Sequence, residues 1–471
     1  MQMKREGNRG GNRDRLFTMA TEANMKATTS AGRSAAGSKT NRRGLLKTAA
    51  LGGGALLGSN LLSAINNGAK AAGKPIPVGG GVPLTGWAAA DGIEFKRGLE
   101  IACEEINAVG GILGRPLEPH FEDTKEQGAA NIIPAMQRLI DRYNVHAIIN
   151  GYNTGAVCAE YDTIADAGIL YLHHNTDVTH YAKIKSNREK YFGIFMSDPA
   201  EYYYGPGLLV FLNNLMQSGG WKRPNNKIAV VTGSQNYSVV IADAIKSKAK
   251  DLGWDISLFE TVVVPISEWG PTLTKIRQDP PAVIAVTHWV PQDLAQFMLQ
   301  FVPNPTNSLV YMQYGPSLAA FREIGKAATN GILYSTVVAS LQDEIGQDFN
   351  NRFKKKFGPS ASPLVAAQVF DSTNIWAIAA ALAGGTSGPG EPDQNRKVAA
   401  RLRPFIYRGT MGTMHFNTEQ GAIPYPDETK DPSLGMPHQF LQIQDFTTEP
   451  ALIAPAPYET SKFRMPPWIK A

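Results

Sequence analysis

Residues 76–123 have the sequence IPVGGGVPLTGWAAADGIEFKRGLEIACEEINAVGGILGRPLEPHFED, which predicts a strand, a helix and a second strand in succession. The short apolar run at 76–84 suits a strand, and its consecutive glycines let neighbouring backbones approach closely. Apolar side chains then recur at the helical period on one face, namely Phe95, Leu99, Ala102 and Ile106. The second strand is predicted at 116–122. Such a unit is typical of α/β folds that contain parallel sheets.

The alternation of short apolar runs with helical patterns occurs in two successive parts of the chain. The first part predicts strands at 76–84, 116–122, 146–150 and 169–173. The second part begins near Lys227 and predicts strands at 227–232, 256–264, 282–287, 308–312 and 331–338. A chain of 471 residues is too long for one ordinary core. We therefore predict an α/β protein with two doubly wound parallel-sheet lobes, the first with strand order 2-1-3-4-5.

The C-terminal part of the chain shows fewer regular patterns. Residues 413–416 and 439–443 predict an antiparallel pair of strands. The Pro-rich segment 447–471 is expected to wrap a surface without a core of its own. The resulting division assigns 74–196 and 335–410 to lobe I, 197–334 and 411–446 to lobe II, and 447–471 to a tail.

The basic charge of the chain is confined to its N-terminal leader. Residues 1–71 hold 12 Lys/Arg and 3 Asp/Glu, whereas the remaining 400 residues hold 34 and 38, a net charge of −4. The charge therefore gives no reason to expect a nucleic-acid partner. Arg42-Arg43 precede a mild apolar run that ends at Ala69-Lys70-Ala71, which predicts a twin-arginine signal peptide at 1–71 and a periplasmic protein. A membrane anchor is the alternative, but the many glycines of the run disfavour it.

The sequence has no motif for nucleotide, metal or catalytic chemistry. Gly-x-x-x-x-Gly-Lys-Ser/Thr, His-Glu-x-x-His, Cys-x-x-Cys and Gly-x-Ser-x-Gly are all absent. His173 and His174 are adjacent on a predicted strand, so their rings point to opposite faces and cannot share one metal ion. Cys103 and Cys158 lie on helices predicted to cover opposite faces of the first sheet, so we expect no disulfide. We therefore expect neither an enzyme nor a cofactor.

Polar residues at the carboxyl ends of the predicted strands are candidates for ligand binding, because doubly wound sheets bind ligands there. Thr154 and Gly155 open a helix, where a hydroxyl and free N–H groups suit a carboxylate, although Thr154 also suits a simple N-cap. Asn175, Thr176 and Asp177 follow the fourth strand, where an ordinary turn is the alternative. These five residues predict a binding site on the first lobe.

Aromatic residues near the same strand ends are further candidates. Trp87 lies in the first strand-to-helix loop, where its ring is free to stack on a ligand, whereas Asp91 there suits a capping box at the helix start. In the second part of the chain, Tyr237 opens a helix and Trp289 follows a strand. Residues 202–204 are three consecutive tyrosines, for which we favour packing between the lobes over a ligand wall.

Four sequence motifs occur in a characteristic order along the first lobe. They are VPLTG at 82–86, GIEFKRG at 92–98, INAVGGILGRPL at 106–117 and FEDT at 121–124. Their order resembles that of the leucine/isoleucine/valine-binding family of periplasmic solute-binding proteins, whose superfamily includes amide- and urea-binding members. The resemblance covers residues 75–445. It implies a type I periplasmic binding fold with a three-segment hinge, which we expect near 193–198, 335–339 and 408–413.

The resemblance also implies roles for the candidate residues of the first lobe. Thr154 and Gly155 match the hydroxyl-and-amide site that receives the α-carboxylate of the ligand. Asn175, Thr176 and Asp177 match the second contact loop of that lobe.

In the second lobe, Tyr237 matches an aromatic contact, and Glu268 or Trp269 falls near another. The segment from Trp289 to Gln292 resembles an aromatic–aromatic–Pro–Glu element whose Glu holds the ligand ammonium. Because Gln292 is neutral, it pairs less strongly with a cation, which argues against an α-amino acid as ligand.

The family's function is to deliver a solute to an ABC importer without catalytic turnover. The expected partners are a small amino-acid-like, polar or aromatic solute and the permease subunits in the inner membrane, and the expected state is a monomer. The alternatives are a periplasmic ligand sensor of the same fold and an enzyme exported by the twin-arginine route.

Overall fold

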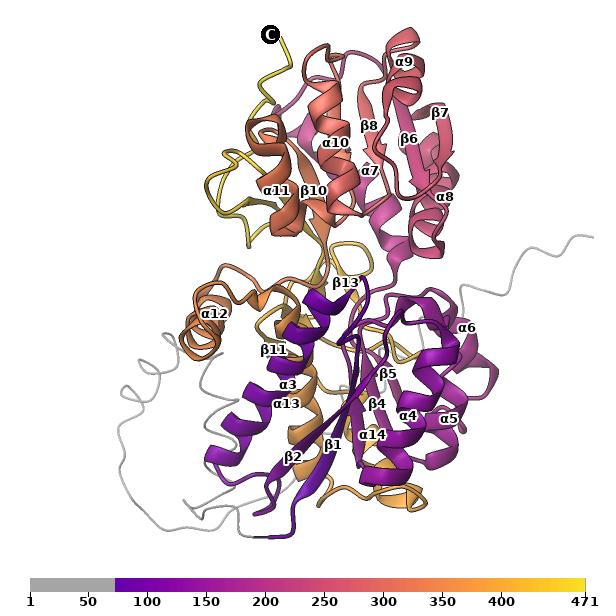
Figure 1. Ribbon diagram of the computed structural model, residues 1–471, viewed down its shortest axis with the longest axis vertical. Coiled ribbons are helices and arrows are strands. Elements are labelled where there is room, and N and C mark those ends of the chain that lie inside the picture. Colours follow the sequence, from indigo (N-terminus) through magenta and orange to yellow (C-terminus); the bar gives the residue numbers. More distant parts are fainter. Residues whose placement is uncertain (1–72, 471) are drawn as a thin grey trace, which may run out of the picture. The chain divides into compact units, whose positions relative to one another are not determined.

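The structure is a computed structural model, and it describes residues 73–470 (Figure 1). Within this range, one parallel sheet and one mainly parallel sheet, each with flanking helices, form two lobes. The predicted α/β class is therefore confirmed. The leader predicted at 1–71 lies outside the described residues.

The first sheet has the predicted strand order, β2-β1-β3-β4-β5. Its strands are β1 (Ile76–Val82), β2 (Leu117–Asp123), β3 (Ala147–Ile149), β4 (Leu170–His173) and β5 (Ile194–Met196). Every pairing in this sheet is parallel, so the carboxyl ends of its strands meet at one edge. The glycines of β1 make room for neighbouring side chains rather than for a neighbouring backbone, since a Cβ on Gly81 would lie 2.5 Å from Met136 Cε.

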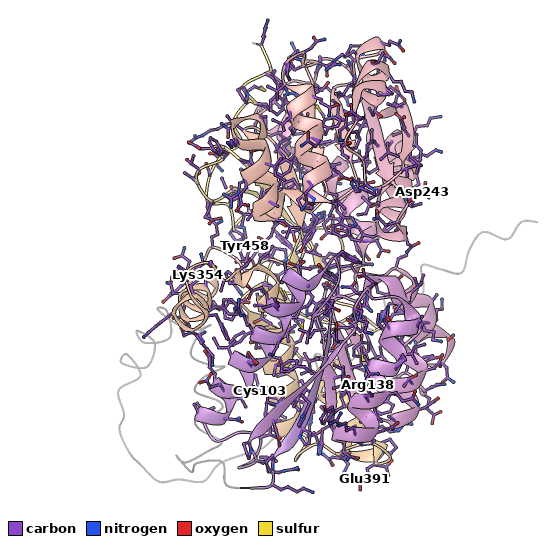
Figure 2. The ribbon with its side chains drawn as sticks, in the orientation of Figure 1. Cys103, Arg138, Asp243, Lys354, Glu391 and Tyr458 are labelled. Carbon is purple, nitrogen blue, oxygen red and sulfur yellow. The ribbon has the colours of Figure 1, made fainter. Side chains whose placement is uncertain are left out.

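Helices pack against both faces of the first sheet. One core cluster contains side chains of α3 (Ala89–Ala108), α12 (Glu344–Phe357), α13 (Pro363–Leu382) and α14 (Pro392–Leu402). The other contains side chains of α4 (Ala129–Tyr143), α5 (Tyr161–Ala167) and α6 (Thr179–Ser186). Cys103, which is labelled in Figure 2, belongs to the first cluster and Cys158 to the second. Both cysteines are free thiols, as their predicted placement requires.

Helix α13 is the central helix of the first lobe. It is long and apolar enough to cross a membrane by length and composition, but most of it is buried inside this lobe. It lies beside α3 (Figure 1), and the two backbones approach closely at Gly98, where a Cβ would lie 2.4 Å from Ala366 O. The apolar character of α13 therefore reflects a core position.

The second sheet has the strand order β16-β15-β10-β9-β8-β6-β7. Its parallel strands are β6 (Lys227–Gly233), β7 (Asp255–Val262), β8 (Val283–Val286), β9 (Leu309–Met312) and β10 (Leu333–Thr336). The antiparallel strands β15 (Gln439–Gln442) and β16 (Ala451–Ala454) extend it at one edge. Helices α7 (Tyr204–Gln217) and α8 (Asn236–Ala249) contribute to one core cluster. Helices α9 (Gly270–Gln278), α10 (Pro291–Phe301) and α11 (Ala319–Gly325) contribute to the other.

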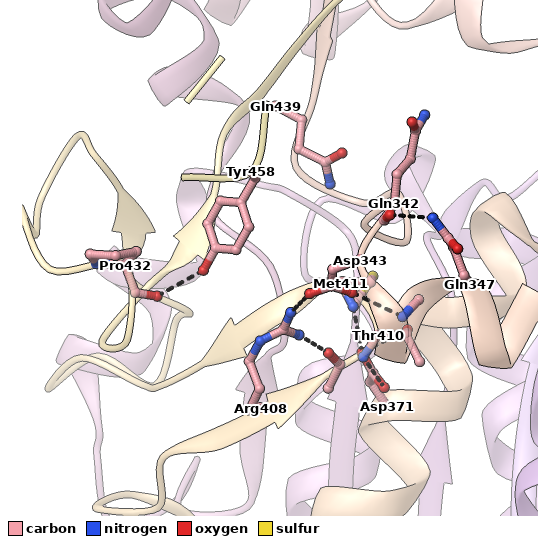
Figure 3. Close-up of polar contacts among 12 residues, drawn as sticks. Gln342, Asp343, Gln347, Asp371, Arg408, Thr410, Met411, Pro432, Gln439 and Tyr458 are labelled. Atoms are coloured by element: carbon pink, nitrogen blue, oxygen red, sulfur yellow. Dashed lines mark hydrogen bonds and ion pairs between the residues drawn. The ribbon is translucent and has the colours of Figure 1, made fainter. Parts of the chain in front are cut away.

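The predicted pairing of 413–416 with 439–443 is wrong. Strand β12 (Gly412–Met414) pairs with β11 (Tyr407–Gly409), while β15 pairs with β10 and β16. The reason is the turn between β11 and β12, which is held by the buried carboxylate of Asp371 (Figure 3). Asp371 accepts hydrogen bonds of 3.0 Å from the backbone N–H groups of Thr410 and Met411 and from Thr410 Oγ1.

The predicted division of the chain between the lobes is also wrong at residues 411–437. Met411, Met414, Phe416 and Met436 are buried in the core of the first lobe. Strand β14 (Met436–Pro437) pairs with β13 (Pro424–Tyr425). Strand β15 of the second sheet begins at Gln439, two residues after the end of β14. The third crossover therefore lies between β14 and β15, and not at 408–413. The other two crossovers follow β5 and β10, next to the predicted segments 193–198 and 335–339.

The C-terminal tail takes part in the second lobe. Strand β16 pairs with β15, and Trp468 is buried against Phe301, with ring centroids 5.7 Å apart. The indole N–H of Trp468 donates a hydrogen bond of 2.9 Å to Ser308 O. The expectation that 447–471 only wraps a surface is thus incomplete, because this segment adds strand β16 to the second sheet and the side chain of Trp468 to its core.

Candidate functional site

A cavity that is partly open to solvent is lined by side chains of both lobes. The first lobe contributes Trp87, Tyr152, His174, Thr176 and Gln368, and the second contributes Tyr204, Tyr237, Trp289, Tyr314 and Val338. Most of these residues follow the carboxyl ends of strands in their sheets. The cavity therefore lies where doubly wound sheets bind ligands.

The two tryptophans of the cavity come from different lobes and contact each other. Trp87 follows β1 and Trp289 follows β8, and their ring centroids are 5.0 Å apart at an interplanar angle of 51°. Trp87 keeps 48% of its surface exposed, so it lies at the mouth of the cavity. The contact between the two rings links the lobes, and aromatic pairs prefer offset or edge-on arrangements to direct face-to-face stacking.

Asp91 lies behind the cavity wall and binds two of its tyrosines. Helix α3 begins at Ala89, so Asp91 belongs to its first turn, and the predicted capping box is wrong. Asp91 Oδ2 accepts hydrogen bonds from the hydroxyls of Tyr152 and Tyr314, the latter at 3.3 Å. Burial raises the pKa of Asp91 above its usual value and holds the pKa of each tyrosine well above its usual range. Both hydroxyls are therefore protonated donors.

The loop after β4 places Thr176 in the cavity and uses its neighbours as supports. Thr176 has a φ of 54° and contributes to the lining. Asn175 Oδ1 accepts a hydrogen bond of 2.8 Å from the backbone N–H of Asn153. Asp177 Oδ1 accepts bonds of 2.9 and 2.7 Å from the backbone N–H and hydroxyl of Thr179, at the start of α6. The structure thus places Thr176 at the cavity, whereas Asn175 and Asp177 hold the loop.

His174 and Gln368 give the cavity its buried polar groups on the first lobe. Gln368 lies on α13 and is fully buried, and neither atom of its side-chain amide has a hydrogen-bond partner among the described residues. His174 Nε2 lies 2.9 Å from Ser372 Oγ, and its Nδ1 lies 3.4 Å from the buried carboxylate of Asp198. Because an unpaired buried amide is costly, Gln368 is available to bind a ligand.

Unlike Tyr314, the other two lining tyrosines of the second lobe, Tyr204 and Tyr237, are held by hydrogen bonds within their own lobe. Tyr237 at the start of α8 accepts a bond of 2.9 Å from Gln313 Nε2, and Tyr204 at the start of α7 accepts one of 3.1 Å from the backbone N–H of Val337. Of the three consecutive tyrosines at 202–204, Tyr204 lines the cavity. The packing role that we favoured for this segment is therefore incomplete.

Besides Asp91, Asn175 and Asp177, three more of the predicted site residues lie outside the cavity lining, namely Gly155, Trp269 and Gln292. Thr154 begins a short 3-10 helix, and Gly155 within it is exposed. Trp269 has no exposed surface, packs against Phe297 with centroids 5.2 Å apart, and donates its indole N–H to Asp293 O. The large apolar indole of Trp269 thus belongs to the core, which corrects its predicted role. Gln292 is exposed on the first turn of α10.

Six lining residues were absent from the predicted site. They are Tyr152, His174, Tyr204, Tyr314, Val338 and Gln368. A signal existed for Tyr152, His174, Tyr314 and Val338, because each lies within three residues of the end of a strand. Gln368 lies inside a helix, so the predicted strand ends gave no indication of it. Among residues 73–470, no group of three or more His, Cys, Asp or Glu side chains is placed to hold a metal ion.

The chain matches a family model described as periplasmic binding protein over residues 75–425. The chain belongs to the periplasmic binding protein family. Members of this family are solute-binding proteins, and the two-lobe architecture with a cavity lined from both lobes fits that description.

Solved structures of similar proteins support the assignment to the periplasmic binding proteins. The chain is 52% identical to a protein from Silicibacter pomeroyi described as a putative branched-chain amino acid ABC transporter, covering 84% of this chain and 100% of that one with a TM-score of 0.82. It shares the fold of LivJ from Streptococcus pneumoniae, a branched-chain amino acid transporter substrate-binding protein solved with isoleucine. That likeness has 18% identity and a TM-score of 0.62, and covers 81% and 100% of the two chains.

A curated relative gives the same family at lower coverage. The chain is 27% identical over 216 residues to Leu/Ile/Val-binding protein homolog 2 of Brucella abortus, which is 45% of this chain and 53% of the relative. The alignment thus spans about half the length of that relative.

Proposed function

We propose that this chain is a periplasmic solute-binding protein that delivers a small organic solute to an ABC importer. The observation that carries the proposal is the cavity, which takes lining side chains from both lobes. A ligand that contacts both lobes favours the closed arrangement, because only differential affinity shifts a conformational equilibrium. The similarity to a protein described as a putative branched-chain amino acid ABC transporter supports the importer role.

The proposal includes the permease subunits of the importer as partners and the twin-arginine route as the means of export. The paired arginines at 42–43 support that route. No catalytic step is proposed, and the ligand is released unchanged.

A thermal-shift screen tests the binding function directly. The panel comprises amino acids, amides, urea, aromatic acids and small organic cations. A true ligand at 100 times its dissociation constant adds about 2.7 kcal/mol to the free energy of unfolding. X-ray scattering with the same ligand should show compaction with unchanged secondary structure.

Uptake measurements separate an importer from a sensor. Deleting the gene should abolish uptake of the ligand found in the screen, and restoring it should recover uptake. Normal uptake after deletion, with loss of a transcriptional response to the ligand, would support the sensor instead.

A further inference from the structure

The walls of the cavity consist mainly of aromatic rings. Six of its ten lining residues are Trp or Tyr, and they come from both lobes: Trp87, Tyr152, Tyr204, Tyr237, Trp289 and Tyr314. The faces of such rings carry negative electrostatic potential and attract cations, with Trp the strongest. Cages of several aromatic rings bind quaternary ammonium groups for this reason.

The carboxyl groups of Asp91 and Asp198 lie next to the cavity. Asp91 is bonded to the hydroxyls of Tyr152 and Tyr314, and Asp198 lies 3.4 Å from the Nδ1 atom of the lining residue His174. No Lys or Arg is among the lining residues of the described chain. An anionic ligand would therefore enter next to carboxylates without a permanent cation to pair with it, which is unfavourable in a buried site.

The two tyrosines that donate hydrogen bonds to Asp91 can offer only acceptor groups to a ligand, which suits a cation. Each hydroxyl has one proton, and Tyr152 and Tyr314 both direct that proton to Asp91 Oδ2. Only the lone pairs of their oxygens remain for other groups, and lone pairs attract positive charge.

Gln368 supplies an independent indication of a ligand. Its side chain is fully buried and lines the cavity, yet its amide oxygen and nitrogen have no partner in the part of the chain that the structure describes. Since buried amides are almost always hydrogen-bonded, a polar group of the ligand is the natural partner. The ligand thus requires a hydrogen-bonding end in addition to a cationic end.

We propose that the cavity selects an organic cation with an alkylated ammonium group, held within the aromatic cage, and with a hydroxyl, carbonyl or amide group bound by Gln368. The proposal rests on the proposed solute-binding function and names the ligand class of the same site. Gln292, which resembles the position of an ammonium-binding Glu, is exposed outside the lining, so the cationic end is assigned to the cage and Asp91.

A comparison of isosteric probes tests the charge requirement. Calorimetric titrations of unfolded and refolded, ligand-free protein use choline and its neutral carbon isostere 3,3-dimethylbutan-1-ol. The two have the same shape and hydroxyl, so any preference reports the charge alone. We expect choline to bind at least about 10-fold more tightly, since desolvated cation–aromatic contacts have that strength. Equal affinities, or tighter binding of leucine or benzoate in the same assay, would overturn the proposal.

Variants locate the preference in the cage. Asp91→Asn and Trp289→Leu should each reduce choline affinity about 10-fold or more while changing the affinity of the neutral isostere less. Asp243→Asn is the matched control, because Asp243 is exposed on α8 (Figure 2) and should leave both affinities unchanged. Parallel losses for both probes would show that charge is not recognised by these residues and would also overturn the proposal.

The proposal and the solute-binding function fail in different ways. If leucine or benzoate binds and compacts the protein, the ligand class is wrong but the solute-binding function stands. If none of the compounds in the screen binds, and mass spectrometry of the natively purified protein finds no small molecule, the solute-binding function fails as well.

Discussion

The hydroxyl of Tyr314 donates a hydrogen bond of 3.3 Å to Asp91 Oδ2, and this bond joins the second lobe to the first at the cavity. Tyr314 follows β9 and has a φ of 53°, and a positive φ is uncommon for a residue other than glycine. Such strained residues concentrate at ligand clamps, where surrounding contacts hold them. Because Tyr314 and Asp91 belong to different lobes, the bond between them forms only when the two lobes meet at the cavity.

Tyr314→Phe should weaken ligand binding about 10-fold, because it removes a hydrogen bond to a charged group that exists only when the lobes meet. Calorimetry with the ligand from the screen measures the affinity. Scattering of the ligand-free variant should also show a more open average shape. Tyr143→Phe is the control, since Tyr143 is the last residue of α4 and its ring stacks on that of His120 in β2, away from the cavity lining. Unchanged affinity and shape for Tyr314→Phe would refute the role of this bond.

Gln368→Leu should stabilise the ligand-free protein and abolish tight binding. The buried amide of Gln368 has no partner among the described residues, so its replacement by an apolar side chain of similar size removes a penalty of about 1–3 kcal/mol. Thermal unfolding with and without ligand measures both effects. Gln439→Leu is the matched control, because Gln439 Nε2 already donates 2.6 Å to Ala339 O and its loss should destabilise the protein. A less stable Gln368→Leu protein would contradict the expectation.

Glu160 should make the protein less stable as the pH rises from about 4.5 to about 7. Burial raises the pKa of Glu160 from 4.5 to about 7, so in this window the folded state holds a proton that the unfolded state has lost. The stability that this proton contributes is complete below the unfolded pKa and is lost as the pH passes the folded pKa.

Glu160→Gln should therefore be more stable than the parent at pH 8 by on the order of 1–3 kcal/mol, and should show a smaller change between pH 5 and pH 8. The amide oxygen can still accept the bonds that Tyr171 and Asn175 donate to Glu160 Oε1. Urea unfolding at both pH values measures the difference, with the exposed Glu118→Gln as control. If the stability of the variant and of the parent changes equally with pH, the raised pKa of Glu160 is not the cause of the pH dependence.

Trp468→Ala should cost about 3 kcal/mol of folding free energy, because it leaves a cavity next to Phe301 and an unpaired carbonyl at Ser308. Denaturant unfolding measures the loss. Met465→Ala in the same segment is the control, since Met465 is 47% exposed and should have little effect. If both variants have the same stability as the parent, the tail contributes nothing to the second lobe.

Replacing Arg42-Arg43 by two lysines should leave the precursor in the cytoplasm, because the twin-arginine route requires the arginine pair. These residues lie outside the described part of the chain. Cell fractionation and immunoblotting give the distribution, and replacement of Lys47 by Arg is the control. Unchanged periplasmic yield would refute the proposed route.

Local sequence patterns were sufficient for most of the fold. The helical period of Phe95, Leu99, Ala102 and Ile106 predicted the buried face of α3, and all four side chains are buried. The strand order of the first sheet followed from the general handedness of crossovers between parallel strands. Strand β5 at 194–196 was not among the predicted strands, and the pairing errors lie after residue 410. Strands of two to four residues carry no readable period, and pairing after residue 410 depends on buried groups such as Asp371.

The residues of the binding site could be predicted only in part from local sequence. The prediction that ligand-binding side chains lie at strand ends located Trp87, Thr176, Tyr237 and Trp289 at the cavity, because strand ends are set by local sequence. The family resemblance added Trp269, which is equally aromatic but lies in the core. Nothing in the local sequence separates an aromatic ring in a core from one in a cavity.

By itself, the sequence determined the two α/β lobes, the strand order of the first sheet and the edge at which a ligand would bind, because hydrophobic periodicity and crossover handedness act over short stretches of chain. Only the tertiary structure decided which groups face one another. Tyr314 meets Asp91 across 223 positions of sequence, and Gln368 reaches the cavity from a helix that returns to the first lobe after the second has been built. Such contacts depend on how the crossovers bring distant segments together, and no local pattern records that.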